Sequence, residues 1–249
     1  MRERSSRRRG VTSRARAVAR DPGPRPVARR SGVAGVERPA VRDRWDTGRT
    51  EAFSDGVFAI AITLLVLDIH VPESGFENLW DGIVDQWPSY LAYVTSFLTI
   101  GALWLAHHGI FARLRFVDST VTRLNLLLLM AASFLPFPTR LMAEAILSSS
   151  AERAAVIFYG STLMAILLLL AAIWRAVAAR RELLLPDVSE QEVDRILRRT
   201  APSLGSYVAV TLFAIVAPHI AAFGYLLIAI MLVVRARGSE QTDATANRS

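Results

Sequence analysis

The feature that most constrains this chain is a series of apolar runs between Thr50 and Arg235, each long enough to cross a bilayer, which takes about 20 helical residues. Four of them are single runs: Phe53–Ile69, Ser89–Phe111, Leu124–Met142 and Ala154–Trp174. The fifth, Ala201–Val234, is roughly twice as long as one span and is broken at Pro218, so we interpret it as a helical hairpin. The pattern predicts an all-α membrane protein with six transmembrane helices.

Arginine is distributed unevenly among the connections between these runs. It is abundant before the first run, in the second and fourth connections and after the last run, and it is absent from the first, third and fifth connections. Basic residues in short loops are retained on the cytoplasmic side of a membrane. The alternation therefore predicts a multi-pass protein of the cell membrane with both termini in the cytoplasm.

The formal net charge of +7 also divides along the chain. Residues 1–49 carry 15 Arg against five acids, a net of +10, whereas residues 50–249 carry 14 Arg against 17 acids, a net of −3. This partition argues against a nucleic-acid-binding protein, and the lack of cysteine excludes disulfides and thiolate metal sites.

Composition also suggests how the chain is divided. We expect residues 1–48 to be an Arg-rich, disordered cytoplasmic leader, residues 49–236 to be the membrane domain, and residues 237–249 to be a disordered cytoplasmic tail. The leader has three interpretations: a tail that touches anionic lipid, a mis-assigned start codon, or a dedicated binding arm.

Ionisable and amide side chains recur at one depth in three sequential runs. Asp55 lies about one turn into the first run, His107 and His108 lie about one turn before the end of the second, and Asn125 lies about one turn into the third. Trp104 shares a helical face with the histidines. We interpret the group as a structural clamp. A proton relay is a second interpretation, and a metal site is a weaker third, because adjacent histidines point about 100° apart on a helix.

An uncharged stripe lies nearly opposite Asp55 on the first predicted helix, since Ile60 is some 140° around the helix from it. The stripe consists of Gly56, Ile60, Leu64, Leu67 and Val71, with Thr63 at its flank. It faces either lipid or a symmetry axis shared with other subunits. Further along, Ser189-Glu190-Gln191-Glu192 is a capping-box pattern, which predicts a short amphipathic helix before Ala201.

The segment Arg49-x-x-x-Phe53-Ser54-Asp55-Gly56-Val57-Phe58-Ala59-Ile60 resembles the first-helix signature of the endosomal/lysosomal-type transmembrane potassium channels, in their prokaryotic six-helix form. Leu103–His108 and Leu124–Leu128 resemble the second- and third-helix motifs of that family, and Ser133–Thr139 is also similar to it. The resemblance covers roughly residues 49–235.

The resemblance implies a homotetrameric cation channel with modest selectivity for potassium and a central pore lined by the first helix. Its hydrophobic constriction would fall on Ile60, Leu64 and Leu67, with a selectivity layer at Thr63. The family's cytoplasmic-side polar clamp would comprise Arg49, Phe53, Ser54, Asp55, Trp104, His107, His108 and Asn125. The permeant ion would be potassium, and neither a cofactor, a resident metal nor a catalytic residue is implied.

A proton-coupled secondary transporter that uses Asp55 and His107 is the alternative function. Such transporters commonly contain internal repeats, and residues 50–142 show no repeat of residues 153–235. An enzyme is not expected, because the sequence contains no recognisable nucleophile, phosphate loop or metal-ligand set.

Overall fold

A computed structural model describes residues 45–70, 76–146 and 151–246 of the chain. Most of the predicted leader and the predicted stripe residue Val71 lie outside the described residues. The chain separates into two units, Met1–Ala40 and Val41–Ser249, and every described helix belongs to the second unit.

The described residues form helices joined by short connections. In chain order they are α1 (Thr47–Leu65), η1 (Val66–Asp68), α2 (Leu79–Asp85), α3 (Trp87–Phe111), α4 (Ser119–Phe134), α5 (Pro136–Ala145), α6 (Glu152–Ala178), η3 (Arg181–Leu183), α7 (Glu190–Phe213) and α8 (Pro218–Ala246). The all-α prediction is thus confirmed for this part of the chain.

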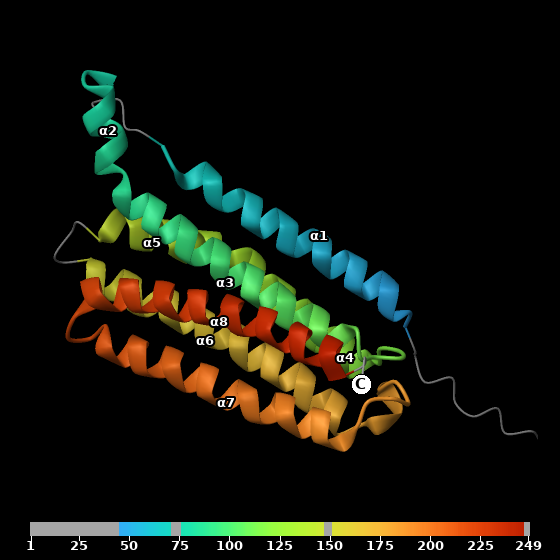
Figure 1. Ribbon diagram of the computed structural model, residues 1–249. Helices are drawn as coiled ribbons and strands as arrows, with labels where there is room; N and C mark the ends of the chain where they lie inside the picture. Colours follow the sequence, from blue (N-terminus) through green and yellow to red (C-terminus); the bar gives the residue numbers. More distant parts are fainter. Residues whose placement is uncertain (1–44, 71–75, 147–150, 247–249) are drawn as a thin grey trace, which may run out of the picture. The chain divides into compact units, whose positions relative to one another are not determined.

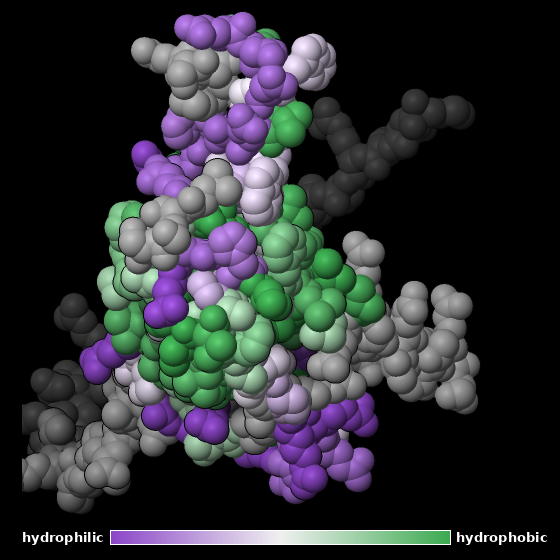
Figure 2. Space-filling model, turned by 90° about the vertical axis from the view of Figure 1, so that its left-hand side faces the viewer, coloured by the Kyte–Doolittle hydropathy of each residue, from purple (hydrophilic) through white to green (hydrophobic). Residues whose placement is uncertain are grey.

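Four helical segments are long and apolar enough to cross a bilayer. They are Thr47–Asp68, Trp87–Phe111, Ser119–Ala145 and Glu152–Ala178, and two shorter apolar segments, Pro202–Phe213 and Pro218–Val234, follow them. On the face shown in Figure 2, hydrophobic residues form a broad central region, with hydrophilic residues at the height of α2 and along the lower edge. The chain is a multi-pass membrane protein.

Two of the sequence predictions need adjustment at proline residues. The third span is divided into α4 and α5 at Leu135, because Pro136 has no amide hydrogen to continue the helix. In contrast, α7 runs without interruption through Pro202, so the short amphipathic helix predicted before Ala201 was wrong as a separate element. Pro202 removes one backbone hydrogen bond from a helix that packs along α6.

The turn signals at the ends of the last two helices are confirmed. Ser189 caps α7 by accepting a hydrogen bond from the Glu192 amide, 3.2 Å away. The predicted hairpin is present, since α7 ends at Phe213 and α8 begins at Pro218. Unpredicted features are α2, which occupies part of the first connection, and the continuation of α8 to Ala246, past residue 236.

Helix α3 packs against α1, α5 and α8, and α6 packs against α4, α5, α7 and α8. Helix α1 lies at the edge of the group opposite α7 and rests on α3 and α4 (Figure 1). It buries only one narrow face, at Ser54, Phe58, Ala61 and Leu65. Over most of its circumference α1 is therefore not packed against the other described helices.

The start of α1 is held by the connection between α3 and α4. Trp45 and Val117 exchange two backbone hydrogen bonds of 2.8 and 3.2 Å. Leu114 and Leu184, in the connection between α6 and α7, form a second antiparallel bridge, whose bonds run from Arg115 N to the Leu183 carbonyl at 2.8 Å and from Leu185 N to the Arg113 carbonyl at 3.0 Å. The side chain of Asp46 then caps α1 by accepting from the Gly48 amide at 2.9 Å. These bonds determine where the first helix starts relative to α3 and α4.

Candidate functional site

Three helices meet in a buried chain of hydrogen bonds near the start of α1. Asn125 of α4 donates through Nδ2 to Ser54 Oγ of α1 at 2.9 Å, and its Oδ1 accepts from His107 Nε2 of α3 at 2.8 Å. Ser54 donates in turn to the Thr50 carbonyl at 2.9 Å. Because Ser54, His107 and Asn125 are all fully buried, the two bonds of Asn125 join three helices in a site that excludes solvent.

The imidazole of His107 is enclosed by aromatic rings. Phe111 stacks on it with ring centroids 4.2 Å apart, and Phe58 contacts it edge-on at 5.4 Å. With Nε2 donating to Asn125, Nδ1 has no hydrogen-bond partner in the described part of the chain. This packing orients His107 as a spacer between α1, α3 and α4.

A second, more exposed pair of contacts joins α1 to α3 alongside the buried chain. Trp104 Nε1 donates to Asp55 Oδ1 at 2.8 Å, and His108 Nδ1 lies 2.7 Å from Glu51 Oε1. The rings of Trp104 and His108 stack, with centroids 5.9 Å apart and planes inclined by 23°. The two carboxylates are four residues apart on α1 and their partners four apart on α3, so the contacts form successive rungs between the helices.

The predicted polar clamp is thus brought together only in part. Hydrogen bonds connect Ser54 with Asn125 and His107, and Asp55 with Trp104, whereas His108 bonds to Glu51, a residue that sequence reasoning missed. The signal for Glu51 was its spacing of one turn from Asp55 on the same helical face.

Two further predicted members lie outside these bonds. The side chain of Phe53 is 58% exposed, and Arg49 is exposed without an ion-pair partner among the described residues. No group of three metal-ligating side chains that could hold an ion occurs among residues 45–70, 76–146 and 151–246.

The uncharged stripe of α1 lies on the uncovered side of the helix. Ile60 is 60%, Leu64 40% and Leu67 71% exposed, and Thr63 is exposed as well. Thr63 Oγ1 donates its hydrogen to the Ile60 carbonyl at 2.9 Å, so its oxygen lone pairs remain available on that surface. The polar contacts therefore anchor one side of α1 while an apolar side with one hydroxyl layer is left uncovered.

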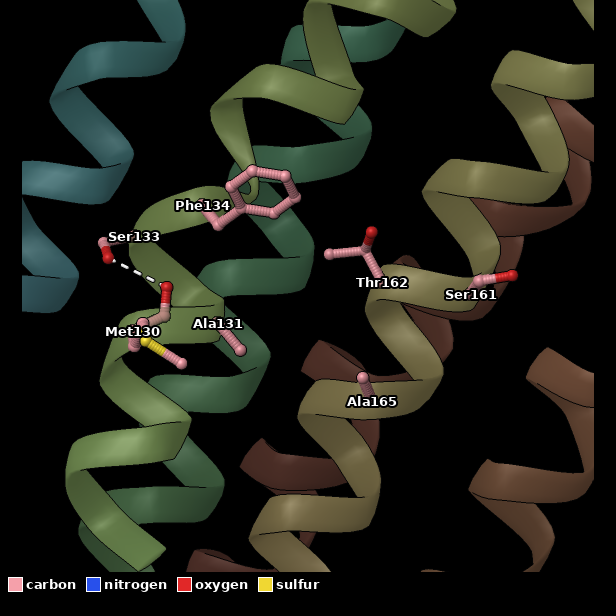
Figure 3. Close-up of a pocket in the computed structure, with 7 residues that line it drawn as sticks. All are labelled: Met130, Ala131, Ser133, Phe134, Ser161, Thr162 and Ala165. Atoms are coloured by element: carbon pink, nitrogen blue, oxygen red, sulfur yellow. Dashed lines mark hydrogen bonds between the residues drawn. The ribbon is translucent and has the colours of Figure 1, made fainter. Parts of the chain in front are cut away.

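A hollow of about 700 Å³ lies between α4 and α6, away from these contacts. Figure 3 shows its lining residues, Met130, Ala131, Ser133, Phe134, Ser161, Thr162 and Ala165. All three hydroxyls donate to carbonyls of their own helices, at 3.0, 2.8 and 2.9 Å. No hydroxyl hydrogen is left to donate to a ligand, so the hydroxyls of this hollow can only accept hydrogen bonds.

Comparison with known proteins gives a consistent result. The sequence model of the family described as endosomal/lysosomal potassium channel TMEM175 matches residues 49–136. Potassium channel B446_29190 of Streptomyces collinus is 42% identical over 185 residues, which cover 73% of this chain and 89% of that protein. Potassium channel Cha6605_3372 of Chamaesiphon minutus is 40% identical over 175 residues, covering 69% and 84%.

A solved structure also resembles the fold. The crystal structure of a lysosomal potassium-selective channel TMEM175 homolog from Chamaesiphon minutus matches with a TM-score of 0.69 and 37% identity, over 76% of this chain and 97% of that chain. This family consists of ion channels, so the chain is not an enzyme. With relatives matched over most of their length, the same fold and the first-helix motif in place, the chain belongs to the TMEM175 family of potassium channels.

Proposed function

We propose that this protein conducts potassium passively through a homotetramer whose central pore is lined by the uncovered stripe of α1. The observation that carries the proposal is the arrangement of α1, which is hydrogen-bonded to α3 and α4 on one side and exposes Ile60, Thr63, Leu64 and Leu67 on the other. Relatives at 40–42% identity that are named potassium channels support the choice of ion.

The chemistry of the stripe matches a constriction better than a binding site. It carries no charge, so it holds an ion weakly and narrows the path until part of the hydration shell is removed. Potassium gives up water more easily than sodium, and a hydroxyl layer at Thr63 compensates some of that loss. Modest selectivity for potassium and closure by dewetting follow from an apolar ring of this kind.

The proposal includes six spans, with α7 and α8 providing the last two, and both termini in the cytoplasm. The polar contacts at Ser54, Asp55, Trp104, His107 and Asn125 then lie toward the cytoplasmic end of α1. Their role is to hold α1 at a set distance from α3 and α4. Because four copies of α1 would surround one axis, a small displacement of each helix changes the width of the constriction.

The proposal is tested by measuring potassium current through variants with polar substitutions in the stripe of α1. Ile60→Asn should increase potassium current in planar bilayers and lower the potassium-to-sodium ratio obtained from reversal potentials, because an amide hydrates the constriction. Leu168→Asn, at a half-exposed position on α6, is the matched control and should leave both values unchanged. Wild-type currents from an Ile60 and Leu64 series would refute the pore assignment, and a detergent-solubilised mass other than four chains would refute the tetramer.

The alternative of a proton-coupled transporter using Asp55 and His107 makes an opposite prediction. Transport would saturate and would require a proton gradient. In this structure His107 bonds to Asn125, and Asp55 to Trp104, so the two groups are engaged separately. Current that persists at equal pH on both sides, nearly linear with voltage, would exclude the transporter.

A further inference from the structure

We propose that the surface between α4 and α6 binds a phospholipid with an anionic headgroup, whose phosphate pairs with Arg123 and Arg175 and whose acyl chain lies in the hollow between Met130 and Ala165. The inference goes beyond the proposed function, because it assigns a ligand to a surface outside the stripe and the polar contacts of α1. It starts from the hollow of about 700 Å³ between the two helices (Figure 3).

The hollow offers a surface suited to hydrocarbon. It lies between Ser119–Ala145 and Glu152–Ala178, two of the segments that are long and apolar enough to cross a bilayer. Small side chains form its walls, since Ala131 of α4 and Ala165 of α6 lie on the two sides of the gap in Figure 3. The hydroxyls around it donate to carbonyls of their own helices. An acyl chain needs no hydrogen bond and fills such a space through dispersion contacts.

Three phenylalanine rings bound the hollow at the end nearer α5. Phe134, Phe137 and Phe158 contact one another with ring centroids 5.4 to 6.2 Å apart. Each of the three side chains is 39–51% exposed, so the rings present apolar surface beside the hollow. Because the rings bound this end, the remainder of a chain that lies in the hollow would extend the other way, toward the start of α4.

An exposed arginine on each helix continues the surface of the hollow in that direction. Arg123 precedes Met130 of α4 by seven residues, and Arg175 follows Leu168 and Ser161 of α6 by seven and fourteen. Spacings of seven and fourteen residues return to nearly the same side of an α-helix. Both arginines are therefore on the side of their helix that the hollow occupies.

The two arginines also lie at a similar depth. Asp118, the cap of α4, pairs with Arg180 just beyond α6, and Arg123 and Arg175 each lie five residues further into the bundle from that pair. At 1.5 Å per residue, Met130 is about 10 Å further along α4 than Arg123. One leaflet contributes about 15 Å of hydrocarbon, half of the bilayer core. A lipid with its phosphate at the arginines thus reaches the hollow within one leaflet, which is the cytoplasmic one in the proposed topology.

The charges at this end of the bundle leave both arginines available to an anion. Neighbouring arginines are neutralised by carboxylates, in the pairs Arg113–Glu192, Arg180–Asp118 and Arg181–Glu190. Within residues 45–70, 76–146 and 151–246, neither Arg123 nor Arg175 has an ion-pair partner. A guanidinium binds phosphate through parallel hydrogen bonds, and an arginine at headgroup depth attracts anionic lipid. This charge complementarity, next to an apolar wall at acyl-chain depth, selects an anionic phospholipid as the occupant.

The first measurement uses the lack of cysteine in the chain, which makes an introduced cysteine a unique labelling site. Full-length Ala165→Cys, labelled with bimane in phosphatidylcholine vesicles, is titrated with phosphatidylglycerol or phosphatidylcholine that carries a nitroxide near the middle of its acyl chain. Phosphatidylglycerol should quench the label at a lower mole fraction, and Arg123→Gln and Arg175→Gln should each reduce this preference about fivefold. Arg153→Gln, exposed at the other end of α6, is the matched control and should keep it, and a label at Ala209→Cys on α7 should show a smaller preference.

Three results of this titration would overturn the proposal. They are a preference that survives when both arginines are replaced, an equal preference at Ala209→Cys, and a label at Ala165→Cys that neither lipid quenches, as expected if a second copy of the chain covers the surface. Arg123→Lys keeps the charge and should retain most of the preference, which separates the loss of a phosphate contact from a folding defect.

The second measurement is native mass spectrometry of the unlabelled protein with added phosphatidylglycerol. Ala165→Leu should fill the hollow and lower the number of lipids retained per chain, as Arg123→Gln should, whereas Ala209→Leu at an exposed position of α7 should match the wild type. Unchanged retention in Ala165→Leu would overturn the assignment of the hollow to an acyl chain. Neither measurement depends on current, so failure of the channel to conduct would refute the proposed function and leave this inference to its own test.

Discussion

Replacement of Asn125 by alanine should destabilise the fold more than any other single deletion in the polar contacts of α1. The substitution removes the 2.9 Å bond to Ser54 and the 2.8 Å bond to His107. Ser54 still donates to the Thr50 carbonyl, but His107 loses its one hydrogen-bond partner among the described residues while its ring stays between Phe58 and Phe111. The larger share of the cost therefore falls on the buried imidazole.

The magnitude follows from the two bonds and the burial of their partners. Interhelical hydrogen bonds in membranes contribute about 0.6 kcal/mol on average and up to about 1.7 kcal/mol. All three side chains are fully buried, and a donor left unpaired in such a place costs about 1–3 kcal/mol. We expect Asn125→Ala to lower the free energy of unfolding by about 2 kcal/mol.

The assay is reversible unfolding in mixed micelles, with a double-mutant cycle between Asn125→Ala and Ser54→Ala. The coupling free energy should be at least about 0.6 kcal/mol if the bond contributes as an ordinary interhelical one. Leu127→Ala, on an exposed position of the same helix, is the control and should change stability by under about 0.5 kcal/mol. The reasoning fails if Asn125→Ala costs no more than Leu127→Ala, or if the coupling is zero within error.

Two further substitutions test the packing that supports the site. Gly160→Ala should lower the free energy of unfolding by about 3 kcal/mol or more, the upper end of the usual range for overpacking, because its Cβ would lie 2.0 Å from the Tyr225 hydroxyl. The control is Gly101→Ala, whose Cβ meets nothing within 4 Å and which should be tolerated in the same thermal unfolding assay. Asp118→Ala removes both the cap of α4 and the ion pair with Arg180, so it should lower the free energy of unfolding by about 1–2 kcal/mol. Asp118→Asn keeps the cap and should lower it by under about 1 kcal/mol. Equal losses of stability in the two variants would contradict the capping role.

Much of the candidate site was predictable because it depends on depth and helical spacing. Asp55, His107 and Asn125 lie at one depth along three apolar runs, and Trp104 is on the same helical face as the histidines. Those relations follow from the rise and period of an α-helix, which are the same in any helical fold. The family signature at residues 49–60 was visible for the same reason, since it lies within one continuous helix.

Which polar groups actually pair was not predictable in this way. Adjacent His107 and His108 were assigned together to the clamp, yet one is buried against Asn125 and the other reaches Glu51. The choice depends on the rotation of α3 about its axis, which is set by its packing against α1, α5 and α8. The length of α7 shows the same limit, because the helix predicted to lie before Ala201 continues to Phe213 along α6.

The sequence by itself determined that this protein spans a membrane in helices, where the polar residues lie along them, and which side of the first helix lacks charge. These are consequences of local hydropathy and of the helical period. Only the tertiary structure decided that Ser54, Asn125 and His107 bond in series, that Glu51 joins His108, and that the other described helices leave the apolar stripe of α1 exposed. The physical reason is that such contacts join helices distant in sequence, and their register and rotation are set by packing across the whole bundle.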